Sequence, residues 1–175
     1  MSMNHSPLES YRKQFLLYKN LGERTLSQLH PEDLLWRPNE ESNSIAVIVH
    51  HLRGNMVSRW TDFLNSDGEK VWRNRDTEFI EDKPSAALVM EWWNEGWACL
   101  MQALAALGDE DLMRIVFIRN ESMTVTDAIV RQIAHYASHV GQIIYIGKSI
   151  RNTEWKTLSI PRGGSATFNS SMDNK

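Results

Sequence analysis

The sequence predicts an all-α protein, a four-helix bundle with a long crossover connection between its second and third helices. In four separate stretches, apolar residues recur at steps of three and four. Capping and turn residues bound each stretch, and no internal repeat interrupts the 175 residues. We therefore expect a single domain over residues 1–175, with a poorly ordered tail from about residue 165, where serine, glycine and asparagine are frequent.

The first two predicted helices have clear start and stop signals. Residues 7–29 form the first, with Ser6 as a cap and the proline at position 31 as the stop. The second opens at Asn43 or Ser44, both good N-caps, and is expected to stop near residues 65–68, Asn-Ser-Asp-Gly. The charged residues 69–83 follow. They contain two aromatic residues, which predicts an ordered connection in which both rings pack.

The third and fourth helices are predicted in the same way. The third begins near Pro84 and ends before Gly108, and we expect its buried side to carry Leu88, Trp92, Leu100, Leu104 and Leu107. Residues 115–118, Ile-Val-Phe-Ile, are expected to be briefly extended. The fourth helix begins at a capping box, residues 124–127, and runs to about residue 150. Its predicted apolar stripe is Val125, Ile129, Tyr136, Val140, Ile143 and Gly147.

Composition excludes several classes of protein. The formal charge is −3 and the isoelectric point about 6.1, which gives no basic footprint for nucleic acid or anionic lipid. No stretch approaches the roughly 20 apolar residues that span a bilayer, and the polar N-terminus lacks a signal sequence. The lone Cys99 fits a reducing compartment and lies in an apolar helical stretch, where we interpret it as a core residue rather than a nucleophile. We expect a cytoplasmic protein with neither membrane nor nucleic-acid partners.

The strongest chemical signal is a pair of histidines, His135 and His139. Four residues advance a helix by about 400°, so both imidazoles point the same way and can hold one metal ion. The pair lies on the flank of the apolar stripe, as expected for a cleft between helices. Tyr136 stands where a zinc protease needs glutamate, which excludes that chemistry. The alternative interpretation is that His135 and His139 are two polar residues on a helix flank and bind no metal.

A third ligand would come from the second helix, because catalytic metal sites commonly use three protein ligands. His50 and His51 are both available, and helix geometry favours His51 only slightly. We interpret His50 as a surface or interface residue. His5 and His30 are interpreted as a tail residue and a helix end.

Four fragments, in order, resemble the DinB-like superfamily. Ser44 is followed seven residues later by a histidine, His51, and His135-xxx-His139 runs into Val140-Gly141-Gln142. Two further fragments, residues 54–70 and 158–161, are similar to one uncharacterised bacterial branch. This resemblance implies a four-helix bundle, often a homodimer, with a divalent metal ion held by His51, His135 and His139. Zinc or nickel is favoured, although three imidazoles also suit copper or iron. Val140 stands where members often have arginine, so any role of that arginine is in doubt.

The resemblance implies a metal-dependent enzyme that acts on a small molecule, either a thiol (S-) transferase or a hydrolase. The alternatives are a non-catalytic metal-binding or stress-associated dimer and, last, an interaction module without metal. No catalytic residue can be assigned from the sequence. Candidates to orient the imidazoles are Asn55, Gln132 and Gln142, and candidates for a general base are Glu91 and Glu95. We interpret the tryptophans as residues of the core and of a dimer surface.

Overall fold

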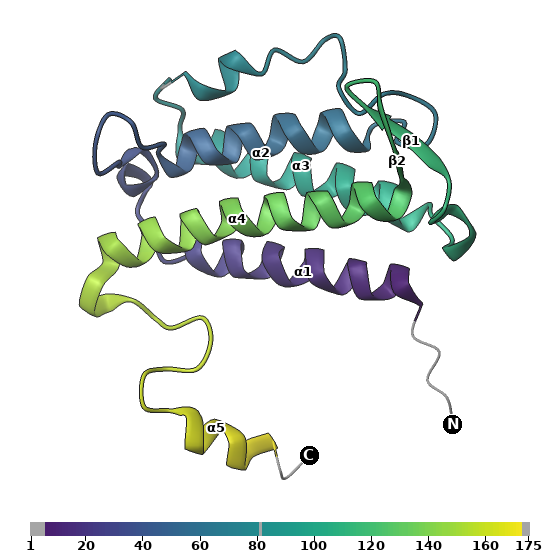
Figure 1. The fold of residues 1–175 in the computed structure, drawn as a ribbon. Helices are drawn as coiled ribbons and strands as arrows, with labels where there is room; N and C mark the ends of the chain where they lie inside the picture. Colours follow the sequence, from purple (N-terminus) through teal and green to yellow (C-terminus); the bar gives the residue numbers. More distant parts are fainter. Residues whose placement is uncertain (1–5, 81, 173–175) are drawn as a thin grey trace.

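Four long helices lie side by side and make up most of the protein (Figure 1). The computed structural model describes residues 6–80 and 82–172, so His5 lies outside the described residues. The helices are α1 (Pro7–Leu26), α2 (Ile45–Trp60), α3 (Ala86–Ala105) and α4 (Val125–Arg151). Helix α2 packs mainly on α3, and α1 on α4. The predicted all-α bundle is confirmed.

Each long helix begins at a hydroxyl-bearing N-cap. The side-chain oxygens of Ser6, Ser44, Ser85 and Thr124 each accept a hydrogen bond from the backbone N–H three residues later. At Thr124 the predicted capping box is complete, because the Asp127 carboxylate accepts from the cap residue in return. The helix starts were therefore predicted closely.

Helix ends were predicted less well. Helix α2 stops at Trp60 rather than near residues 65–68, because Asp62 adopts a left-handed backbone conformation, with φ of +48°. Helix α1 likewise ends at Leu26, and residues 31–35 form a short 3₁₀ helix, η1 (Pro31–Leu35), before α2.

The core is one cluster that draws on all four long helices. The predicted stripe of α4 is buried throughout. The predicted face of α3 was partly wrong, because Leu88 is exposed and Trp92 is only half-buried. Instead, the buried residues of α3 are Val89, Trp93, Gly96, Trp97, Leu100 and Leu104. Helix α3 carries apolar residues on nearly every side of its first two turns, so the sequence pattern could not fix its inner face.

The connection from α2 to α3 crosses the top of the bundle in Figure 1 and carries the short helix η2 (Asp76–Phe79). Phe79 packs against the bundle, whereas Trp72 remains 57% exposed, contrary to the expectation that both rings pack. The predicted extended segment is strand β1 (Ile115–Ile118), which pairs antiparallel with β2 (Glu121–Thr124). The hairpin turn places Arg119 and Asn120 in the left-handed region.

After α4, the chain passes through a short 3₁₀ helix, η4 (Asn152–Glu154), and leaves the bundle. Residues 165–172, for which we expected poor order, form helix α5 (Ser165–Met172), and none of its residues is buried. Two short helices, η3 (Asp109–Asp111) and η1, complete the described elements. Among the described residues, no helix is both long and apolar enough to cross a membrane.

Candidate metal centre

Three histidines from two helices meet between α2 and α4. One ring nitrogen from each of His51, His135 and His139 lies within 4.8 Å of the others. His51 Nε2 and His135 Nε2 are 3.3 Å apart. The three rings meet edge to face, with centroids 4.6 to 5.3 Å apart. These are the three residues that the family resemblance in the sequence implied as a set.

His51 is held by a carboxylate from the crossover. Its Nδ1–H donates to Glu78 Oε2 at 2.9 Å, and both side chains are only 5% exposed. Phe79, the next residue of η2, covers the same imidazole at 4.8 Å between ring centroids. The bond to Glu78 fixes the tautomer of His51, so that its Nε2 presents a lone pair towards the other two histidines.

Glu78 itself is fixed by a buried arginine. The Arg73 guanidinium donates to both Glu78 oxygens, at 2.7 and 2.8 Å, and its side chain is 2% exposed. Burial raises the pKa of Glu78, but the hydrogen bonds from His51 and Arg73 outweigh it and hold that pKa below its usual value. Glu78 is therefore an anion at neutral pH and not a poised general base.

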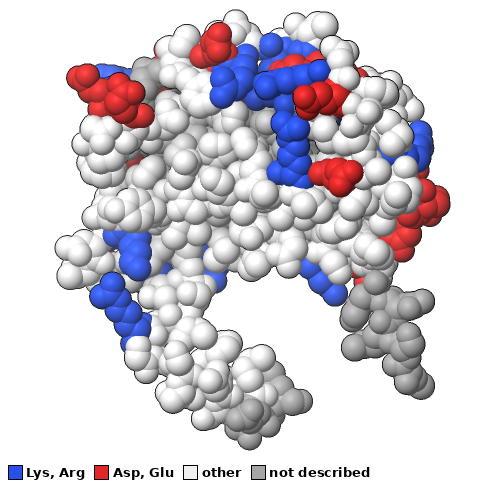
Figure 2. Space-filling view, in the orientation of Figure 1, with Lys and Arg blue, Asp and Glu red and all other residues white. Residues whose placement is uncertain are grey.

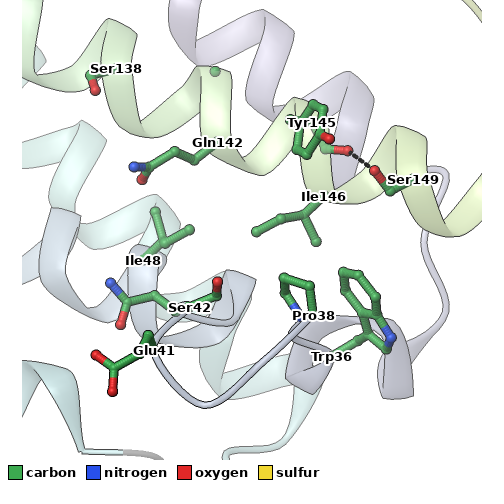
Figure 3. A pocket seen from close by; sticks show the side chains of 12 residues that line it. Trp36, Pro38, Glu41, Ser42, Ile48, Ser138, Gln142, Tyr145, Ile146 and Ser149 are labelled. Atoms are coloured by element: carbon green, nitrogen blue, oxygen red, sulfur yellow. Dashed lines mark hydrogen bonds between the residues drawn. The ribbon is translucent and has the colours of Figure 1, made fainter.

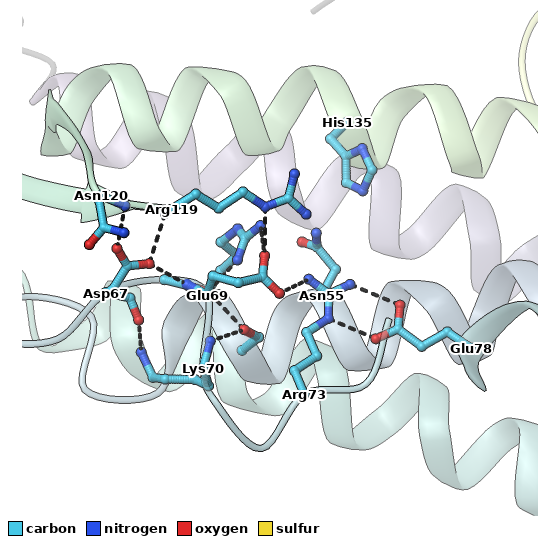
Figure 4. Close-up of polar contacts among 12 residues, drawn as sticks. Asn55, Asp67, Glu69, Lys70, Arg73, Glu78, Arg119, Asn120 and His135 are labelled. Atoms are coloured by element: carbon cyan, nitrogen blue, oxygen red, sulfur yellow. Dashed lines mark hydrogen bonds and ion pairs between the residues drawn. The ribbon is translucent and has the colours of Figure 1, made fainter. Parts of the chain in front are cut away.

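The Glu78–Arg73 pair belongs to a larger charged network along the crossover (Figure 4). Glu69 accepts hydrogen bonds from Arg59 and Arg119, each at 3.0 Å, and lies 3.6 Å from Arg73. Asp67 accepts from the backbone N–H groups of the hairpin turn. Figure 2 shows charged side chains gathered over this upper region, whereas the middle of the same face is largely uncharged. The network joins the hairpin, the crossover and α2 behind the histidines.

A glycine allows Glu78 to reach His51. A Cβ added at Gly54 would lie 2.1 Å from Glu78 Oε1, so any larger residue would displace the carboxylate. Gly54 is one turn beyond His51 on α2, and both face the crossover. The close approach of the crossover to α2 thus depends on this position.

His139 is oriented from within α4, and both histidines of this helix are kept neutral by their surroundings. The His139 Nδ1–H donates to Gln142 Oε1 at 2.9 Å, which leaves His139 Nε2 available. Burial, together with the neighbouring imidazoles, lowers the pKa of His135 to about 3. Burial also lowers the pKa of His139, although its bond to Gln142 opposes this. Both imidazoles are neutral at pH 7, which is the form that binds metals.

His50 takes no part in this cluster. Its ring stacks on Trp92 of α3, with centroids 4.2 Å apart and an angle of 15°. The neighbouring positions 50 and 51 therefore face different helices, one towards α3 and the other towards α4.

Of the other described residues that the sequence suggested for the site, one hydrogen-bonds to a histidine of the cluster and the rest do not. Gln142 contacts a histidine as predicted, but Asn55 accepts a hydrogen bond from the Tyr136 hydroxyl instead, and Gln132 Oε1 is buried without a partner among the described residues. Neither proposed general base reaches the cluster. Glu95 pairs with Arg53 at 2.8 Å, and Glu91 is exposed on α3. The carboxylate at the site is Glu78, which no pattern in the crossover had indicated.

The donor set fits a divalent transition-metal ion. Nitrogens bound tetrahedrally to zinc at 2.0–2.1 Å are about 3.3–3.4 Å apart, close to the separation of His51 and His135. A histidine that binds a metal usually donates its other N–H to a carboxylate, a carbonyl oxygen or water. Glu78 and Gln142 supply those acceptors for two of the three rings. The three nitrogens lie within 4.8 Å of one another, so the widest pair would have to approach by up to about 1.5 Å to bind one ion.

The fold and the site together define a helical-bundle protein with a candidate three-histidine metal centre. A family model described as "Protein of unknown function (DUF1572)" matches residues 2–164. Because the match covers nearly the whole chain, the protein belongs to this family. The search of curated proteins found no significant match.

Proposed function

We propose that this protein is a DinB-like, metal-dependent enzyme whose His51, His135 and His139 hold one divalent ion, zinc or nickel. The observation that carries the proposal is the convergence of the three imidazole nitrogens, with a buried carboxylate bound behind His51. The resemblance of residues 44–52 and 135–142 to the DinB-like superfamily supports it independently.

The residues around the cluster favour thiol transfer over hydrolysis of substrates whose leaving group must be protonated, such as amides. A bound divalent ion supplies Lewis acidity, which lowers the pKa of a coordinated water or thiol. Glu78 is held as an anion by Arg73, so it is poorly suited to exchange a proton with a substrate. In thiol transfer, the thiol loses its proton to solvent, its sulfur bonds to an electrophilic carbon, and the leaving group departs with the bonding electrons. That reaction needs no carboxylic acid at the site.

Metal binding is tested by elemental analysis and by zinc titration of purified variants. We expect one zinc per chain in the wild type. Zinc affinity should fall by more than about 100-fold in each of the variants His51→Ala, His135→Ala and His139→Ala. The reason is that mutating even a residue that only hydrogen-bonds to a metal ligand lowers metal affinity about 10- to 100-fold. His50→Ala is the matched control, since His50 faces Trp92. Unchanged affinity in the three variants, or loss only in the control, would refute the assignment.

Thiol transfer is tested separately. Zinc-loaded protein is mixed with 1-chloro-2,4-dinitrobenzene and either L-cysteine, glutathione or coenzyme A, and chloride release is followed. We expect a rate above the uncatalysed reaction with at least one thiol, and its loss in His139→Ala. If metal binds but no thiol reacts faster, and esters are hydrolysed instead, the hydrolase alternative replaces the transferase.

A further inference from the structure

A cavity of about 760 Å³ lies next to the histidine cluster, between α4, the start of α2 and the segment that follows η1 (Figure 3). Its volume falls in the range of small-molecule binding sites, which is about 300–1,000 Å³. On α4 its lining residues recur at steps of three and four, and they are Ser138, Gly141, Gln142, Tyr145, Ile146 and Ser149. The cavity therefore follows one face of this helix.

That face continues directly from the histidines. Gln142 lines the cavity and also binds His139 through its Oε1. On α2, the lining residue Ile48 lies one turn before His51. Both helices that supply the metal ligands thus supply the cavity wall in the adjacent turn. A molecule in the cavity would reach the histidine cluster past the Gln142 amide.

The α4 wall of the cavity is open at Gly141. A Cβ added at Gly141 would meet no atom within 4 Å. At the other glycines of the four long helices, an added Cβ would lie 3.0 Å or less from a neighbouring side chain. Close packing therefore requires glycine at those positions, whereas packing does not require glycine at position 141. Because glycine within a helix is destabilising relative to alanine, the open space at Gly141 is a feature of the cavity and not of the core.

The chemistry of the wall restricts what can bind. Apolar and aromatic surface comes from Trp36, Pro38, Ile48, Tyr145 and Ile146. Glu41 is the only charged residue of the lining within residues 6–80 and 82–172. Arg37 does not line the cavity, and its guanidinium donates to the Glu40 carbonyl. The Glu41 carboxylate would therefore repel an organic anion in the cavity, and no lining cation would offset that repulsion. A neutral or cationic molecule would bind without this repulsion.

We propose that this cavity binds the acceptor substrate of the metal centre, a neutral or cationic small molecule with an aromatic or similarly flat apolar body. The proposal rests on the proposed function for the role of that molecule as acceptor, but its binding can be tested without any reaction. The anionic groups common in low-molecular-weight thiols make the thiol itself a poor fit for this cavity.

Three probes with the same ring and different charge test the cavity: 2-naphthylmethylamine, 2-naphthalenemethanol and 2-naphthoate. Binding is measured by fluorescence anisotropy with metal-free protein, so that no probe can bind through an ion. We expect the amine to bind about two- to fivefold more tightly than the alcohol, and the naphthoate to bind more weakly than the alcohol by a similar factor. This factor corresponds to the energy of one exposed ion pair. Glu41→Gln should bring the three affinities together.

Gly141→Phe is the blocking variant, because Gly141 lines the cavity and an added Cβ there meets no atom within 4 Å, so the ring is attached at an open point of the wall. It should weaken binding of the amine and the alcohol at least tenfold, whereas Gly141→Ala should change it less than twofold. Val130→Phe, on an exposed part of α4 outside the lining, controls for added bulk. The zinc stoichiometry of each variant is measured in parallel.

The outcomes separate the two proposals. If the probes bind as expected but the wild type binds no zinc, the cavity assignment stands and the metal centre fails. If zinc binds but Gly141→Phe leaves probe binding unchanged, or naphthoate binds as tightly as the amine, the cavity assignment is overturned and the metal centre remains.

Discussion

Replacing Gly54 with alanine should damage the candidate metal site without changing any of its three histidines. The new Cβ would lie 2.1 Å from Glu78 Oε1 and 2.7 Å from its carboxyl carbon, so the carboxylate must move away from α2. His51 then loses the acceptor for its Nδ1–H. Loss of such a partner typically costs 10- to 100-fold in metal affinity, and we expect zinc affinity to fall by about that factor.

The same change should lower the free energy of unfolding. Breaking a buried ion pair costs about 3–5 kcal/mol, and Arg73 is buried with Glu78 as its closest partner. Alanine regains up to about 1 kcal/mol of helix propensity over glycine. The expected net loss is about 2–4 kcal/mol for complete separation of the pair, and less where Arg73 follows the displaced carboxylate.

Zinc affinity is measured by competition with a chromogenic chelator, and stability by denaturant unfolding of the metal-free protein followed by circular dichroism. Gly141→Ala is the matched control, because its Cβ meets no atom within 4 Å. It should stabilise the protein by about 0.5–1 kcal/mol and leave zinc affinity unchanged. If Gly54→Ala binds zinc as the wild type does and is equally stable, the inferred coupling from Gly54 through Glu78 to His51 is wrong.

Three further predictions concern parts of the bundle around the site. Tyr136→Phe removes a hydroxyl that accepts from Trp60 Nε1 and donates to Asn55 Oδ1, both at 3.0 Å. Denaturant unfolding should show that the free energy of unfolding falls by about 1–3 kcal/mol, with zinc affinity unchanged. An equally stable variant would contradict this. Partial burial raises the pKa of Asp67, but hydrogen bonds from backbone N–H groups outweigh it and hold that pKa below its usual value. The contribution of Asp67 to the free energy of unfolding is therefore complete above about pH 4 and is lost as the pH falls through the folded-state pKa. Asp67→Asn should make the free energy of unfolding depend less on pH in this acid range, and an unchanged dependence would refute this. The protein should be a two-fold homodimer, so light scattering should give about twice the chain mass of 20.2 kDa, whereas the single-chain mass at micromolar concentration would exclude the dimer.

The sequence predicted the elements that local patterns determine. Helix starts follow from a hydroxyl followed by an apolar run, and caps formed at Ser6, Ser44 and Thr124 as expected. The cap at Ser85 was not predicted, although the third helix does begin close to Pro84. The pair His135 and His139 was predicted because an i, i+4 spacing on one helix is a local feature of the sequence. His51 was separated from His50 mainly by resemblance, and the structure gives the physical difference, since His50 stacks on Trp92 while His51 faces α4.

What the sequence could not predict depends on contacts between distant segments. Glu78 lies 27 residues after His51, in a crossover without periodicity, so nothing marked it among the acidic residues there. Glu91 and Glu95 were candidates for a general base because they lie on the third predicted helix, and nothing in the sequence placed either of them at the cluster. Strand β2 was missed because its four residues, Glu-Ser-Met-Thr, lack apolar alternation, and its pairing with β1 depends on the turn at Arg119 and Asn120.

The crossover's contribution to the site links metal occupancy to folding. The histidine cluster requires α2, α4 and the intervening crossover in place at once, and 84 residues separate His51 from His135. An unfolded chain holds no such arrangement, so a bound ion would add free energy only to the folded state. At a free metal concentration 100 times the dissociation constant, that amounts to about 2.7 kcal/mol. The thermal midpoint of this protein should therefore follow free metal concentration, and the chain would be most exposed to proteolysis where metal is scarce.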